Sequence, residues 1–197
     1  MKYKTIGILA ILGAVVLFLN SILFLLGFAV STGAIKAETL NTLPLSGVLL
    51  FVLKHFNLIA AFFAVIMLLV YFGVYFGFAR FGAQLKNRSF QYASYFILIS
   101  FLISSLLTLL LFFGVTSQSI DPLQKIVEFL TFTACIWFGI SLLKIKHSFN
   151  VLLGILGVFY IVQGFAILSN LFLPIRIIDF SIAIMIALSF LFFNLKK

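Results

Sequence analysis

Six long apolar stretches, separated by short polar segments, make up most of this chain of 197 residues. An α-helix needs roughly 20 mainly apolar residues to cross the hydrocarbon core of a bilayer, and it satisfies its backbone hydrogen bonds within one segment. The sequence therefore predicts an all-α, polytopic integral membrane protein, a bundle of six transmembrane helices in a single transmembrane domain, residues 1–197. The predicted spans are residues 5–30, 56–79, 91–115, 123–143, 151–173 and 175–193.

The composition argues against a soluble domain. Apolar residues make up 64% of the chain and charged residues 9%, whereas soluble domains average about 45–50% and about 25%. The net charge of +9 comes from 13 Lys and Arg that lie mainly at the ends of the apolar stretches and form no continuous stripe. We therefore expect the lipid bilayer as their partner and no binding of nucleic acid.

Basic residues are distributed unequally between the two ends of the predicted spans. Nine of the 13 would share one side, namely Lys2, Lys4, Arg80, Lys86, Arg88, Lys144, Lys146, Lys196 and Lys197. Because cytoplasmic loops carry the excess of Lys and Arg, this side and both termini are predicted to be cytoplasmic. The acids, Glu38, Asp121, Glu128 and Asp179, then fall on the outer side. The excess of Lys over Arg and the 27 Phe are typical of an AT-rich prokaryotic genome, so we expect a prokaryotic plasma (inner) membrane.

Local signals predict several helix boundaries. Asp121-Pro122 is typical of a helix start, with Asp121 as the N-cap, and Pro174 separates the last two spans. The first apolar run continues for some 26 residues, longer than the core of a secretory signal peptide, so we expect an uncleaved first helix. The connection 31–55 is apolar in its second half and is expected either to lie in the outer interface or to extend the second helix.

The fourth and sixth spans are too short without their acids. Glu128 is followed by 15 residues before Lys144, and Asp179 by 14 before Asn194. Neither run reaches the roughly 20 residues that a span needs, so both acids are expected at or just below the outer edge of the hydrocarbon. Ionisable residues at that depth usually face the bundle interior, a partner or water.

Each of these acids has a base three residues earlier, Lys125 before Glu128 and Arg176 before Asp179. That spacing places both members on one helix face. One interpretation is self-pairing at the interface, with the long basic side chains reaching outward. The other is an outward-facing polar site formed by both acids together with His55.

A few uncharged polar residues lie within the predicted spans. They are Asn20, Gln163, Ser100, Ser104 and Thr108, the last three in register at spacings of four. Such residues usually form interhelical hydrogen bonds, and a polar path for a substrate is the alternative. Small-residue pairs, Gly73 with Gly77 and Ala10 with Ala14, predict close helix packing within the chain or against a partner.

The sequence contains no nucleophile beside a base, no Gly-rich phosphate loop and no His-Glu-x-x-His, so no catalytic residue or cofactor is expected. His55 and His147 lie on opposite sides of the membrane and cannot share a metal, and the lone Cys135 is interpreted as a packing residue.

We therefore expect a subunit for transport or membrane binding of a small solute, with an outward-facing polar site. An accessory or assembly subunit of a membrane protein complex, with a membrane protein partner or a homo-oligomer, is the alternative. An intramembrane lipid-modifying enzyme that uses Glu128, Asp179 and His55 ranks last.

Overall fold

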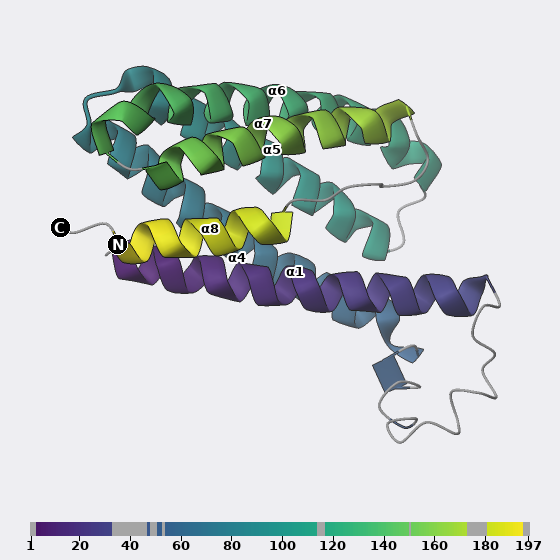
Figure 1. The fold of residues 1–197 in the computed structure, drawn as a ribbon. Helices are drawn as coiled ribbons and strands as arrows, with labels where there is room; N and C mark the ends of the chain where they lie inside the picture. Colours follow the sequence, from purple (N-terminus) through teal and green to yellow (C-terminus); the bar gives the residue numbers. More distant parts are fainter. Residues whose placement is uncertain are drawn as a thin grey trace.

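The computed structural model describes residues 3–32, 47, 51–52, 54–113, 117–149, 151–172 and 181–194. The main helices are α1 (Tyr3–Ser31), α4 (Phe56–Gln84), α5 (Arg88–Phe112), α6 (Ser117–Phe149), α7 (Val151–Phe172) and α8 (Ser181–Asn194) (Figure 1). No strand occurs among the described residues. The all-α membrane bundle predicted from the apolar stretches is thereby confirmed.

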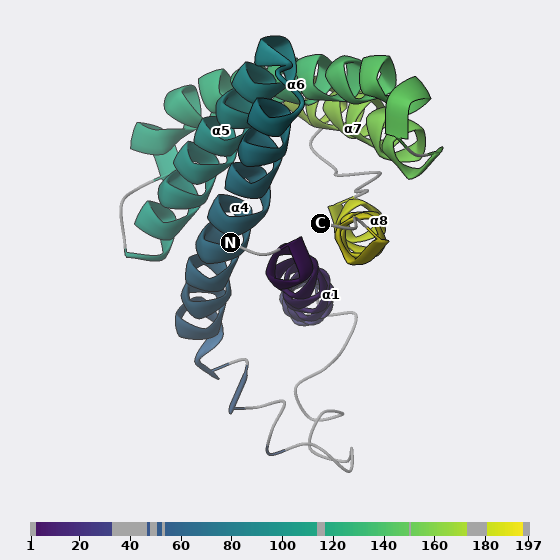
Figure 2. The ribbon, with the colours of Figure 1, turned by 90° about the vertical axis from the view of Figure 1, so that its left-hand side faces the viewer.

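These helices pack in chain order into a closed ring. Each contacts the helix before it and the helix after it, and α8 contacts both α7 and α1, which closes the ring (Figure 2). Tyr3, at the start of α1, donates a hydrogen bond to Gln84 at the end of α4 and stacks on Phe192 at the end of α8, with 6.2 Å between the ring centroids. The start of α1 and the end of α8 therefore lie at one end of the bundle (Figure 1), which we call the terminal end; the other is the distal end.

Five of the helices are long and apolar enough to cross a bilayer. The exception is α8, which has 14 residues and is therefore about 21 Å long at 1.5 Å per residue. It lies beside the terminal part of α1 (Figure 1), and residues 173–180, which include Pro174 and the start of the sixth predicted span, lie outside the described part of the chain. Most of the connection 31–55 also lies outside it.

The predicted start of the fourth span at Asp121-Pro122 is wrong. Helix α6 begins at Ser117 and continues through Pro122, so Asp121 is an interior residue and not the N-cap. Pro122 is the sixth residue of α6, so it removes one backbone hydrogen bond in the second turn without ending the helix. Ile120 is buried in the bundle, and this packing stabilises the additional turn.

Glycines allow α6 and α7 to pack with their backbones in contact. A Cβ atom added at Gly139 would lie 2.6 Å from the carbonyl oxygen of Gly157, and one added at Gly157 would lie 2.8 Å from that of Gly139. Real side chains do not tolerate such distances, so only Gly fits at both positions of this crossing. The two helices can therefore approach more closely than larger residues would permit.

The buried core is concentrated toward the terminal end. We divide the bundle at the level of Ser181, the first residue of α8. The terminal half comprises residues 3–16, 67–84, 88–103, 131–149, 151–163 and 181–194; the distal half comprises residues 17–31, 56–66, 104–112, 117–130 and 164–172. Among the described residues, 29 of 34 buried hydrophobic side chains belong to the terminal half. The described residues of α8 pack against α1 and α7 in this half.

Candidate functional site

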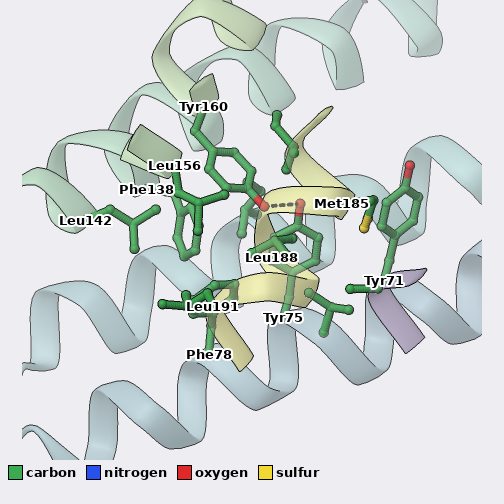
Figure 3. Close-up of a cluster of buried hydrophobic side chains, with 14 of the residues drawn as sticks. Tyr71, Tyr75, Phe78, Phe138, Leu142, Leu156, Tyr160, Met185, Leu188 and Leu191 are labelled. Carbon is green, nitrogen blue, oxygen red and sulfur yellow. Dashed lines mark hydrogen bonds between the residues drawn. The ribbon is translucent and has the colours of Figure 1, made fainter. Parts of the chain in front are cut away.

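A pair of tyrosines joins opposite sides of the ring inside the terminal half. The hydroxyl groups of Tyr75 on α4 and Tyr160 on α7 lie 2.9 Å apart and form a hydrogen bond, in which either can be the donor (Figure 3). Both side chains are buried. Phe138 on α6 packs edge-on against them, with centroids 4.7 Å from Tyr160 and 5.9 Å from Tyr75. The hydrogen bond therefore connects two helices that are not neighbours in the ring.

Sequence reasoning missed this pair. Tyrosines are common inside apolar spans and do not by themselves mark a site, although the hydroxyl group of a buried tyrosine usually needs a partner. The available signal was the position of Tyr160 three residues before Gln163, on one face of the fifth predicted span. A polar face on an otherwise apolar helix is expected to point into the bundle.

The next polar group along α7 is the side chain of Gln163, which is buried. Its Nε2 atom donates a hydrogen bond of 3.3 Å to Oγ of Ser181, the first residue of α8. Together Tyr75, Tyr160, Gln163 and Ser181 form what we call the interior polar seam. Gln163, predicted as a polar residue within the membrane, thus lies at the boundary between the two halves and links α7 to α8.

The other predicted polar residues have different surroundings. Ser100 is buried, and its hydroxyl group donates to the carbonyl oxygen of Phe96 in its own helix at 2.9 Å. Thr108 is exposed and donates to the carbonyl oxygen of Ser104 at 3.0 Å. Asn20 is half-buried on α1. Within the described part of the chain, Gln163 is the member of this group that bonds to another helix.

The predicted charged residues that the structure describes lie in or near the distal half. Glu128 is half-buried on α6 and accepts a hydrogen bond of 3.2 Å from Nε2 of Gln124, one turn earlier. Lys125 is exposed, and within the described residues no ion pair joins it to Glu128. His55 precedes α4 and packs against Phe51, with 4.6 Å between the ring centroids. Asp179 and Arg176 lie outside the described residues.

The small-residue pairs lie inside the bundle. Ala10 and Ala14 on α1 are buried within the chain, as are Gly73 and Gly77 on α4. A Cβ atom added at Gly77 would clash with the side chain of Ile6. The side chains of Ala10 and Ala14, for which the sequence left two uses open, are buried inside the bundle.

The side chains of the interior polar seam are uncharged hydrogen-bonding groups. In the described ranges, no three His, Cys, Asp or Glu side chains are grouped as metal ligands would be. Cys135 is buried next to Gly164, at whose position an added Cβ atom would lie 3.3 Å from the Cβ atom of Cys135. Phenol, amide and hydroxyl groups of this kind can bind a neutral polar group by hydrogen bonding.

Comparison of the chain with protein-family models, with curated proteins and with solved structures finds no match.

Proposed function

We propose that this protein is a multi-pass membrane subunit that binds a small, largely apolar solute in the distal half of its bundle. The observation that carries the proposal is the position of Gln163, a buried amide at the boundary between the close-packed terminal half and the distal half. A buried amide in a membrane protein is costly unless it forms hydrogen bonds, and such residues frequently mark substrate sites. A solute with one carbonyl or hydroxyl group could exchange hydrogen bonds with Gln163 and Ser181.

The close packing of the terminal half favours entry of the solute from the distal side. Large side chains that are almost fully buried fill the ring interior there, namely Tyr75, Phe78, Phe90, Phe138, Tyr160 and Phe192. Their rings pack against one another, for example Phe90 on Phe138 with centroids 5.4 Å apart. A solute that entered from the distal side would therefore meet closely packed aromatic rings beyond Gln163.

The charge distribution provides the orientation for this proposal. The excess of Lys and Arg at the terminal end favours the cytoplasm on that side, so the distal end would face outward across the plasma membrane of a prokaryote. Glu128 and Lys125 on α6, with His55 before α4, would then lie toward the outer mouth of the site. We include Asp179 and Arg176 in this proposed mouth because of their place in the sequence.

The bulky outward side of α1 argues against a closely packed partner helix. Among its exposed side chains are Ile8, Leu12, Val15 and Leu19, whereas its small residues Ala10 and Ala14 point inward. Large aliphatic side chains suit contact with lipid, and helix partners in membranes prefer small residues at their interface. For this reason we place the accessory or assembly role second.

Native mass spectrometry of the protein in a mild detergent tests the proposal. Wild-type protein should retain a small molecule that organic extraction releases, and Gln163→Leu should lose most of it. Thr133→Val is the matched control, because Thr133 is exposed and its hydroxyl group bonds within α6 to the carbonyl oxygen of Phe129 at 3.0 Å. Thermal unfolding of each variant would show whether loss of the solute reflects loss of the fold.

Two results would contradict the proposal. One is wild-type protein without any retained small molecule but with a stoichiometric membrane protein partner, which would favour the assembly role. The other is equal retention by wild-type protein and a folded Gln163→Leu variant, which would remove the interior polar seam from the binding site.

A further inference from the structure

A stripe of four side chains runs along α4 toward the terminal end. Phe72, Phe76, Arg80 and Ala83 follow one another at spacings of four, four and three residues and therefore share one helix face. Phe72, Arg80 and Ala83 are exposed, and Phe76 is half-buried. Helix α4 packs against α1 and α5 through other residues, among them Gly77 facing Ile6 and Gly82 facing Phe90. We call these four residues the α4 stripe.

The α4 stripe is apolar along most of its length and cationic near the terminal end. Phe72 and Phe76 are stacked, with centroids 5.6 Å apart and an angle of 5° between the ring planes. The guanidinium carbon of Arg80 lies 5.8 Å from the centroid of Phe76, a cation–π distance that holds the charge beside the rings. Ala83 has only a methyl group, which leaves room next to Arg80 on its terminal side.

A second cation follows in the turn between α4 and α5. Lys86 has a φ of 54°, the left-handed conformation that usually belongs to Gly after a helix C-terminus. The turn is closed by hydrogen bonds from the backbone N–H of Lys86 to the carbonyl oxygen of Ala83 at 3.1 Å and from Asn87 to Gly82 at 3.0 Å. A lysine at a position where glycine would be less strained suggests that its exposed charge has a use.

This hairpin contains cations and no carboxylate of its own. No Asp or Glu occurs between Glu38 and Asp121, so α4, α5 and their turn contribute Arg80, Lys86 and Arg88 without an acidic partner. Charge complementarity therefore requires an anion from elsewhere. Because the cations continue an exposed aromatic stripe on a membrane-spanning helix, the matching molecule has an apolar chain and an anionic head.

We propose that the α4 stripe and Lys86 bind one anionic phospholipid of the leaflet at the terminal end. An acyl chain lies along Phe72 and Phe76, and the headgroup phosphate lies between Arg80 and Lys86 beside Ala83. Guanidinium groups bind phosphate through several N–H donors, and Lys adds a flexible point charge. This inference goes beyond the proposed solute binding and does not depend on it.

Native mass spectrometry of the detergent-solubilised protein, titrated with phosphatidylglycerol or with phosphatidylcholine of the same acyl chains, tests the assignment. One phosphatidylglycerol should bind at least about fivefold more tightly than phosphatidylcholine, since one cation near an anionic lipid contributes about that factor. Arg80→Gln and Lys86→Gly should each lower the affinity for phosphatidylglycerol about fivefold. Lys86→Gly relieves the left-handed strain, so it is expected to fold at least as well as wild-type protein.

Lys144→Gln is the matched control, because Lys144 is an exposed cation of the terminal half on α6 and lies outside the α4 stripe. Its affinity for phosphatidylglycerol should equal that of wild-type protein. Equal binding of the two lipids, or an equal loss in Lys144→Gln and Arg80→Gln, would overturn the proposal. Displacement of the lipid by millimolar inorganic phosphate would also overturn it, because the site would then recognise a free anion and not a lipid.

Discussion

The terminal and distal halves of the bundle are built from the same kinds of residue but differ in how the helices cover one another. In the terminal half α8 completes the ring of helices. The buried aromatic side chains and the Tyr75–Tyr160 hydrogen bond lie inside this ring of helices. Of the distal residues that the structure describes, five hydrophobic ones are buried, namely Leu23, Ala60, Leu109, Ile120 and Val127, and Glu128, Asn20 and Thr108 also lie there. The difference suggests that folding stability resides mainly in one half and that ligand contact is expected in the other.

Truncation of one phenylalanine in each half tests this comparison between the halves, and we expect it to give the largest difference in the free energy of unfolding. Phe138, with 0% exposure in the terminal half, and Phe129, with 55% exposure in the distal half, both lie on α6. Phe138→Ala leaves a cavity among Tyr75, Phe90 and Tyr160 and should lower the free energy of unfolding by about 3–5 kcal/mol. Phe129→Ala should change it by less than about 1 kcal/mol, because that side chain faces lipid. Unfolding in mixed detergent, followed by circular dichroism, measures both.

Comparable losses in Phe138→Ala and Phe129→Ala would show that stability is spread over the whole bundle. The division into a stabilising terminal half and a ligand-binding distal half would then be wrong.

The tyrosine pair should give a smaller effect that depends on both partners. Tyr160→Phe removes an interhelical hydrogen bond and leaves the Tyr75 hydroxyl group buried without it, so it should cost about 1 kcal/mol. The double variant Tyr75→Phe/Tyr160→Phe removes both hydroxyl groups. It should be less destabilised than the sum of the two single variants.

A double-mutant cycle on the free energy of unfolding measures this coupling. Additive effects of the two single substitutions would contradict the hydrogen bond as a connection between α4 and α7. Tyr92→Phe is a suitable control, because Tyr92 is exposed and should tolerate loss of its hydroxyl group.

The smallest expected effect has the opposite sign. Lys86→Gly places glycine at a φ of 54° and should raise the free energy of unfolding by roughly 0.5 kcal/mol, since relief of strain is partly offset by greater freedom of the unfolded chain. For a chain of this size that corresponds to an increase of about 1–2 °C in the unfolding temperature. The unfolding temperature is measured in detergent without added lipid. If Lys86→Gly lowered it, the Lys86 side chain would stabilise the turn directly, and its charge would not need a lipid partner.

Part of the candidate site was predictable from single residues. Gln163 stands out in the sequence as an amide within an apolar span, and the structure places it in the interior with Ser181. The Tyr75–Tyr160 pair was not predictable, because its members are 85 positions apart and belong to helices that are not adjacent in the ring. The direction in which Ala10 and Ala14 face likewise does not follow from the sequence, because it depends on how α1 packs against α4 and α8.

Segment length and apolar content in the sequence are enough to identify a helical membrane bundle and the approximate position of most of its helices. Both are local properties of a segment. In lipid such a segment forms a helix, because a helix satisfies its backbone hydrogen bonds within the segment. The ring order, the extension of α6 through Pro122 and the interior polar seam depend instead on packing between helices. A helix that is apolar on all sides has no polar face to indicate its rotation, so packing against its neighbours determines which of its residues face inward.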